Sequence, residues 1–347
     1  MLRREFLHSL IVAGAATLIG SRIGSAADEA PAMDVLAPSF DFHSHGWRQN
    51  GFAAGMKQGG MNVAVMASIS DRPLIKLEGG RLRASGSPPR GHLHYHAMRQ
   101  VGDIKRAIES EQLATVLTPA EATSARAAGR PGIIIGFEGA DVLEGSLERV
   151  GEIHAEGARL LQLVHYRVNE LGDIQTEEPV HNGLTPFGAD VVRACNRLGI
   201  IVDVAHATFE VTAQVLKTAT RPLVLSHTYL IDRPRRNTRG ITRDHARAVA
   251  ETGGAIGIVP FPSTFPTLQH YANGIAKMAD AVGVDHVGIA SDMTGIPVGT
   301  PPFNNYQQLP QIVQALADTG FKREEVQKIM GGNFMRVFKA VSTVTPN

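Results

Sequence analysis

The stretch FDFHSH at Phe40–His45 opens with aromatic residues and ends in two histidines that are separated by a single residue. Aromatic residues are enriched in strands, and side chains two positions apart on a strand point to the same face. His43 and His45 are therefore predicted to converge on one metal ion at the tip of a buried strand. Two packed histidines would give the same pattern, so the weight of this motif depends on similar strand ends further along the chain.

Seven more short apolar runs follow, and helix-like segments separate most of them. Together with the first run, strands are predicted at residues 35–43, 61–68, 132–138, 158–165, 200–206, 222–227, 254–259 and 284–292. Near-continuous hydrophobic strands that alternate with helices are typical of a parallel sheet covered on both faces. The sequence thus predicts an α/β fold, a (β/α)8 barrel of the TIM type with a metal site at the C-terminal ends of its strands. The alternative is an open doubly wound sheet, which the lack of a Gly-x-Gly-x-x-Gly turn after an early strand disfavours.

The composition limits the classes of partner. The formal net charge of +1 argues against nucleic acid or an anionic membrane as the main partner. A single cysteine, Cys195, excludes an intramolecular disulfide, and its helical surroundings predict a small buried residue rather than a nucleophile. Residues 78–91 are rich in Gly, Pro, Ser and Arg and predict a surface loop. His245 is predicted to lie on a solvated helix face.

The N-terminal residues have the features of an export signal. Arg3 and Arg4 precede an apolar run at residues 11–19, and small residues follow at 25–27. This order predicts a twin-arginine-type signal peptide over residues 1–27, followed by a single (β/α)8 metallohydrolase domain over residues 28–347. An N-terminal membrane anchor is the alternative, but the apolar run is shorter than the ~20 residues that span a bilayer. The mature protein is therefore expected to be periplasmic or exported, with no membrane attachment after cleavage.

Six of the eight predicted strands end in residues that bind metals or transfer protons. These residues are His43, His45, Glu138, His165, His206, His227 and Asp292. A parallel barrel gathers the C-terminal ends of its strands at one opening, where barrel enzymes have their active sites. One such histidine would most often be structural, but the recurrence at six strand ends predicts a shared site.

Each residue type suits a role in a site with two metal ions. Imidazole nitrogens bind Zn²⁺ and similar divalent ions, so His43 and His45 would hold one ion and His206 and His227 the other. The two oxygens of the Glu138 carboxylate would bridge the ions and offset their repulsion. A bridging hydroxide, acidified by both ions, would be the nucleophile.

The remaining polar residues suit proton transfer and substrate binding. Asp292 could take the proton of the nucleophile and pass it to the leaving group, and His165 could polarise the substrate carbonyl. Arg233, Arg235 and Arg236 form a basic cluster after the sixth strand. A solvated loop is the simplest interpretation of this cluster, although one guanidinium could also bind a substrate carboxylate.

Several segments resemble the membrane dipeptidase (renal dipeptidase-like) family of metallopeptidases, within the amidohydrolase group. The resemblance extends from about residue 41 to residue 341. It is most specific at GLTPFG (residues 183–188), DVAH (203–206), SH followed by RRN (226–227 and 235–237), DHVGIASD (285–292) and GGNF (331–334).

The resemblance implies a binuclear zinc barrel that hydrolyses dipeptides and forms a homodimer. It implies metal ligation by His43, Glu138, His206 and His227 with Glu138 bridging, carbonyl contact by His165, carboxylate binding by Arg236 and proton transfer by Asp292. The family usually has His-x-Asp in the first strand, whereas this chain has His43-Ser44-His45. The exchange leaves the site about one charge unit more positive, which can change the preferred divalent metal.

Two other functions remain open at this point. One is an amidohydrolase that acts on another amide or on a lactone, for which a carboxylate-binding arginine would be dispensable. The other is a non-catalytic periplasmic protein that binds a metal or a ligand. Glu138, His165 and Asp292 argue against the second alternative, because binding alone requires no proton transfer.

Overall fold

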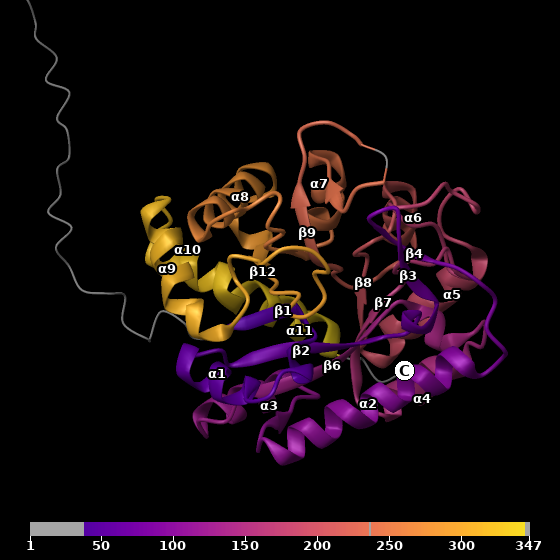
Figure 1. The fold of residues 1–347 in the computed structure, drawn as a ribbon, viewed down its shortest axis with the longest axis horizontal. Coiled ribbons are helices and arrows are strands. Elements are labelled where there is room, and N and C mark those ends of the chain that lie inside the picture. The colour runs from indigo at the N-terminus through magenta and orange to yellow at the C-terminus, as the bar shows by residue number, and fades with distance from the viewer. Residues whose placement is uncertain (1–37, 236, 344–347) are drawn as a thin grey trace, which may run out of the picture. The chain divides into compact units, whose positions relative to one another are not determined.

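The computed structural model describes residues 38–235 and 237–343, and these contain a closed parallel barrel (Figure 1). The barrel strands are β1 (Phe40–Ser44), β2 (Val63–Ile69), β6 (Gly132–Glu138), β7 (Ala158–Gln162), β8 (Ile201–Asp203), β9 (Val224–Leu230), β11 (Ala255–Ile258) and β12 (Val287–Ile289). They pair in the order β9-β11-β12-β1-β2-β6-β7-β8, and a pairing of β8 with β9 closes the ring. The predicted (β/α)8 barrel is therefore confirmed. The predicted signal peptide, residues 1–27, and Arg236 lie outside the described residues.

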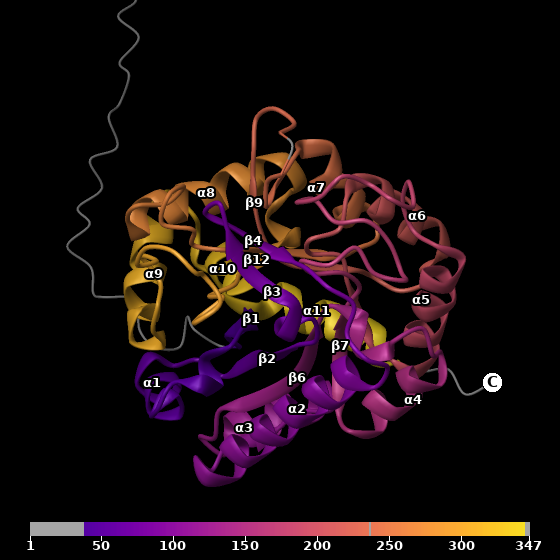
Figure 2. The ribbon, with the colours of Figure 1, turned by 45° about the vertical axis from the view of Figure 1, so that its right-hand side comes forward.

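Most of the helices surround the barrel and cover the outer face of its strands, whereas the last one, Asn333–Ser342, lies behind the strands and packs against Phe40 and Phe42 (Figure 2). The helices are α1 (Phe52–Gly59), α2 (His92–Ser110), α3 (Pro119–Ala127), α4 (Glu148–Ala155), α5 (Pro186–Leu198), α6 (Phe209–Thr218), α7 (Arg243–Glu251), α8 (Leu268–Val282), α9 (Leu309–Asp318), α10 (Arg323–Gln327) and α11 (Asn333–Ser342). Threonine side chains accept the first free backbone N–H groups of α3, α5, α6, α7 and α8, which fixes where these helices begin. None of the described helices is long and apolar enough to cross a membrane.

Aromatic residues fill the barrel on the side away from the strand ends that carry the histidines. Phe40 stacks on Phe334 of α11 at 5.2 Å between ring centroids, and Phe42 meets the same ring edge-on at 4.9 Å. All three rings are fully buried in one cluster with inward residues of the other strands. The interior is thus a packed core, and the histidine-bearing strand ends lie at the opposite end of it.

A small antiparallel hairpin differs from the prediction of a loop over residues 78–91. Its strands are β3 (Ile75–Glu78) and β4 (Arg81–Ala84), and Gly79 and Gly80 form the turn with φ of 57° and 77°. Two consecutive left-handed residues suit a tight two-residue hairpin turn, which glycine adopts without steric cost. The hairpin crosses the barrel opening in Figure 2. Two short strands, β5 (Ala114–Thr115) and β10 (Gly240–Ile241), extend the sheet.

Candidate metal centre

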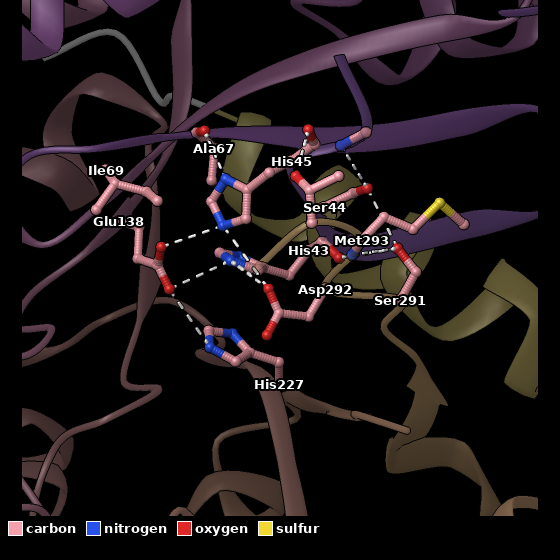
Figure 3. A network of polar contacts seen from close by, with 12 residues as sticks. His43, Ser44, His45, Ala67, Ile69, Glu138, His227, Ser291, Asp292 and Met293 are labelled. Atoms are coloured by element: carbon pink, nitrogen blue, oxygen red, sulfur yellow. Dashed lines mark hydrogen bonds and ion pairs between the residues drawn. The ribbon is translucent and has the colours of Figure 1, made fainter. Parts of the chain in front are cut away.

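The carboxylate of Glu138, the last residue of β6, lies at the centre of a cluster of imidazoles (Figure 3). Its Oε1 lies 3.3 Å from Nε2 of His43, 3.2 Å from Nε2 of His165, 3.6 Å from Nε2 of His206 and 3.5 Å from Nε2 of His227, and its Oε2 lies 3.2 Å from Nε2 of His45. All six side chains are buried. The structure therefore brings together every metal ligand that the sequence predicts, around one carboxylate.

Hydrogen bonds outside the cluster orient two of the rings. Nδ1 of His45 lies 3.0 Å from the carbonyl oxygen of Ala67 on β2, so this nitrogen donates and Nε2 faces Glu138 with its lone pair. Nδ1 of His165 lies 2.7 Å from Oδ1 of Asp71, whose other oxygen accepts the backbone N–H of Tyr166 at 3.0 Å. Such outer contacts hold ligating imidazoles in one tautomer and one orientation.

Several ring nitrogens lack the partners that a metal-free core would need. Within the described residues, both nitrogens of His43 and Nδ1 of His206 are buried without a hydrogen bond. Nε2 of His206 lies 3.1 Å from Nε2 of His227. Two aromatic nitrogens aimed at one point, and buried donors left unpaired, are costly unless a cation lies between them. The donor set fits divalent metal ions of the zinc type.

Among the residues that the structure describes, three groups of side chains have ligand atoms close enough for one ion each. They are His43, His45 and Asp292; His43, Glu138 and His227; and Glu138, His165 and His206. The first two groups share His43 and the last two share Glu138, so adjacent ions in this cluster would have common ligands. This overlap fits two neighbouring ions better than two independent sites.

The electrostatics of the cluster favour metal ligation. Burial alone would raise the pKa of Glu138, but His165 and His43 hold it well below its usual range, so the carboxylate is charged. Burial lowers the pKa of His206 and His227 well below the usual value, which keeps these rings neutral. For His43, Glu138 outweighs burial and raises the pKa to about 9, so a metal ion must displace a proton from this ring.

Asp292 and His206 adopt an unusual backbone conformation. Their φ angles are 45° and 66°, in the left-handed region that non-glycine residues rarely adopt. Oδ1 of Asp292 lies 3.7 Å from Nε2 of His45 and 4.0 Å from Nε2 of His43. Burial raises the pKa of Asp292 against the lowering effect of His43, and a raised pKa suits a group that exchanges protons.

One arginine that the sequence analysis did not select faces the cluster. Arg239 is 8% exposed, donates from Nη1 to Gln175 Oε1 at 2.7 Å and from Nη2 to the carbonyl of His227 at 3.1 Å. By contrast, Arg233 and Arg235 of the predicted basic cluster are exposed. Arg239 stands three residues before Thr242, which caps α7, and one residue before β10. Arg239 therefore lies where the chain returns to the barrel, at the start of β10.

Asp71 is the second residue that sequence reasoning missed, because it follows β2 by two positions instead of ending the strand. A cavity of about 350 Å³ is lined by Glu138 and four of the imidazoles around it, those of His45, His165, His206 and His227, together with Tyr166, Arg239 and the β3–β4 hairpin. Ile75, Leu77 and Leu82 of the hairpin contribute apolar surface at its opening. The cavity therefore combines a polar floor with an apolar cover, which is typical of sites for small ligands.

Comparison with known proteins identifies relatives. The model of the membrane dipeptidase family, peptidase family M19, matches residues 88–347. Dipeptidase tcpJ of Claviceps purpurea is 28% identical over 235 residues, which are 62% of this chain and 52% of that protein. Dipeptidase verJ of Clonostachys rogersoniana is 27% identical over 258 residues, 72% of this chain and 66% of that protein. The chain thus spans between about half and two thirds of the length of these curated relatives.

Solved structures share the fold. A metallo peptidase from Rhodobacter sphaeroides, liganded with a phosphinate mimic of the dipeptide L-Ala-D-Ala, has a TM-score of 0.74 and 21% identity, with 88% of this chain and 99% of that chain covered. An amidohydrolase from Pseudomonas aeruginosa has a TM-score of 0.76 and 20% identity, with 90% and 99% covered. His43 and His45 precede the residues that the family model matches.

Proposed function

We propose that this chain, which belongs to the membrane dipeptidase family (peptidase family M19), is a metal-dependent hydrolase that cleaves the amide bond of dipeptides. The observation that carries the proposal is the buried Glu138 carboxylate, which five imidazole nitrogens surround at 3.2 to 3.6 Å. A cavity of about 350 Å³ above this cluster suits a small substrate.

We infer two zinc ions, or other divalent ions, with Glu138 as their common ligand. His43 and His45 would hold one ion, and His206 and His227 the other. Bound divalent ions would supply an acidified water as the nucleophile and would polarise the scissile carbonyl. The unpaired ring nitrogens of His43 and His206 support this assignment.

Two residues would move or donate protons. Asp292, whose pKa burial raises, would accept the proton of the nucleophile and deliver it to the leaving amine. Asp71 and Glu138 together outweigh burial and raise the pKa of His165. The ring would keep its Nδ1–H on Asp71 and, whenever Nε2 carries a proton, direct that N–H toward the oxygen of the tetrahedral intermediate.

The free carboxylate of the substrate would bind an arginine. The family resemblance implies Arg236 for this role, and we propose Arg239 instead, because its guanidinium is buried and lines the cavity. Two anchors, Gln175 and the His227 carbonyl, hold the planar group in one orientation, which suits a paired contact with a carboxylate.

We also propose export of the protein through the signal that residues 1–27 encode, supported by the Arg3-Arg4 pair. Fusing these residues to a reporter that is active only outside the cytoplasm tests the proposal. Activity should appear with the native pair and disappear when both arginines are replaced by lysine. A reporter that stays inactive with the native pair would exclude the signal.

The enzymatic proposal is tested by elemental analysis of the purified protein and by hydrolysis of a dipeptide panel before and after chelation. We expect close to two ions per chain and hydrolysis that chelation abolishes and zinc restores. Hydrolysis that survives complete metal removal would contradict the proposal. The proposal would also be contradicted if the protein hydrolysed no dipeptide after loading with zinc, manganese or cobalt.

A further inference from the structure

Two arginines outside the proposed catalytic machinery line the same cavity as the metal cluster. Arg48 follows His45 by three residues, and Arg72 follows β2 by three residues. Both therefore lie at the side of the cavity that β1 and β2 form. Nothing in the proposed hydrolysis of an unspecified dipeptide requires either of them.

Neighbouring side chains hold the Arg48 guanidinium in place. Its Nη2 donates to Oε1 of Gln100 at 3.0 Å, and its Cζ lies 5.0 Å from the centre of the Trp47 ring. Gln100 is itself buried and donates to the carbonyl of Ile69 at 2.9 Å. A guanidinium that is stacked and hydrogen-bonded on one edge keeps its other N–H groups available for a ligand.

Both arginines are solvent-exposed, and neither forms an ion pair within the part of the chain that the structure describes. Among the described residues, no carboxylate oxygen lies within 4.0 Å of a guanidinium nitrogen of Arg48 or Arg72. Burial, and to a smaller extent the like charge of Arg72, lower the pKa of Arg48 against the opposing charges of Glu138 and Asp103. Two like charges that share a cavity repel each other, and an anion between them removes that cost.

The charge of the whole cavity points in the same direction. Among the described residues, three arginines and two carboxylates line it, the latter being Glu138 and Asp292, and any divalent ions would add positive charge. His45 contributes no negative charge where the related family usually has aspartate. A dipeptide with one carboxylate and one ammonium group leaves this excess uncompensated, whereas a second carboxylate offsets part of it.

The barrel geometry indicates which end of a dipeptide would meet Arg48 and Arg72. In the closed ring of eight strands, β2 and β9 are four positions apart and lie on opposite sides. Arg239 is bonded to β9 through the His227 carbonyl, whereas Gln100 ties Arg48 to Ile69 at the end of β2. A substrate whose terminal carboxylate binds Arg239 therefore crosses the metal cluster and directs its N-terminal residue toward Arg48 and Arg72.

We propose that Arg48 and Arg72 bind the side-chain carboxylate of the N-terminal residue, so that dipeptides beginning with aspartate or glutamate are the preferred substrates. This inference rests on the proposed dipeptidase function and adds the class of substrate to it. The two arginines act as specificity determinants, and the proposed proton transfers do not involve them.

The decisive measurement is the ratio of kcat/KM for Glu-Ala to that for Gln-Ala, two dipeptides of nearly equal shape that differ in one charge. We expect the metal-loaded protein to prefer Glu-Ala by about tenfold or more, the usual effect of a hydrogen-bonded ion pair. R48M and R72M should each lower this ratio by about tenfold. R126M, which removes an exposed arginine on α3, should leave the ratio unchanged.

The possible failures are distinguishable. A wild-type ratio near one, or a ratio that R48M and R72M leave intact, would overturn the inference while the dipeptidase function stands. Absence of all dipeptide hydrolysis would count against the proposed function. In that case calorimetric titration of the metal-loaded protein with glutamate and with glutamine tests the arginine pair directly, since equal affinity for both amino acids would exclude an anion site.

Discussion

Asp71 holds His165 by a buried hydrogen bond of 2.7 Å between Oδ1 and Nδ1, and its second oxygen accepts the backbone N–H of Tyr166 at 3.0 Å. One carboxylate thus fixes both the ring and the backbone of the segment that follows β7. The opposite nitrogen of the ring, Nε2, points at Glu138 at 3.2 Å. Asp71 is therefore a positioning residue for the proposed oxyanion contact.

Replacing Asp71 with asparagine should lower kcat by about 10- to 100-fold, the usual cost of losing an outer partner of a site histidine. The carboxamide can accept only at its oxygen, so the second contact to Tyr166 or the contact to His165 is lost. Steady-state kinetics should show KM and metal content close to wild type. D190N, on the exposed surface of α5, serves as the control. A loss of bound metal in D71N would instead indicate that Asp71 supports ligation.

Replacing Glu138 with glutamine should remove at least one metal ion per chain. The amide keeps the shape of the side chain but loses the charge that faces five imidazoles. We expect activity to fall by more than about 100-fold, since direct ligands matter more than their outer partners. Elemental analysis of E138Q measures the first effect. Retention of two ions would contradict the bridging role.

Replacing His45 with aspartate should strengthen metal binding, because an anionic ligand replaces a neutral one next to Glu138 and Asp292. The readout is the chelator concentration at which half of the metal is lost, and we expect it to rise about tenfold. Weaker binding in H45D would show that the imidazole, which Ala67 orients, is the better ligand in this cavity.

Replacing Arg239 with lysine should raise KM for a dipeptide by about 10- to 100-fold, since a paired contact with the terminal carboxylate becomes a single one. The same dipeptide with an amidated C-terminus should show little difference between wild type and R239K. R236K tests the earlier prediction in parallel. If R236K raises KM and R239K does not, the carboxylate binds Arg236 and our reassignment is wrong.

His245 should make the stability of the protein depend on pH. The ring is 3% exposed, bonds Thr212 Oγ1 at 2.9 Å, and burial lowers its pKa to about 4. The unfolded chain binds a proton near pH 6.5 and the folded chain does not, so stability falls as the pH drops from about 6.5 to about 4. Urea unfolding should show that H245Q loses roughly 3 kcal/mol less than wild type over this range. If the free energy of unfolding depended on pH in the same way for both proteins, His245 would not be the group responsible.

The barrel could be predicted because each strand is a short run of apolar residues with helical segments between the runs. All eight predicted strands are present, and the match to the family model confirms the resemblance that the motifs indicated. The hairpin at Ile75–Ala84 escaped prediction because its strands alternate over only four residues each and carry charged side chains. His245, expected to be solvated, is buried because α7 packs this side of its surface inward.

Site residues that end strands could be predicted from the sequence, whereas those in connections could not. Phe42 fills the barrel while Asp41 bonds Tyr306 outside it, so strict alternation would direct His43 outward. The register between β1 and β2 shifts between Asp41 and Ser44, a segment that includes His43. The imidazole of His43 nevertheless contacts Glu138. Asp71 and Arg239 lie in connections, where no periodicity marks a side chain as inward. Only tertiary structure assigns such residues to the site.

The left-handed backbone conformation of His206 and Asp292 lowers the stability of the fold that carries this site. Each such conformation costs about 1–3 kcal/mol, which glycine or asparagine would reduce. A sequence-design procedure that optimised only the stability of this backbone would therefore replace both residues. Selection for a higher melting temperature alone would be expected to replace His206 and Asp292 first. Retention of these two residues under such selection would therefore measure the functional constraint on the site.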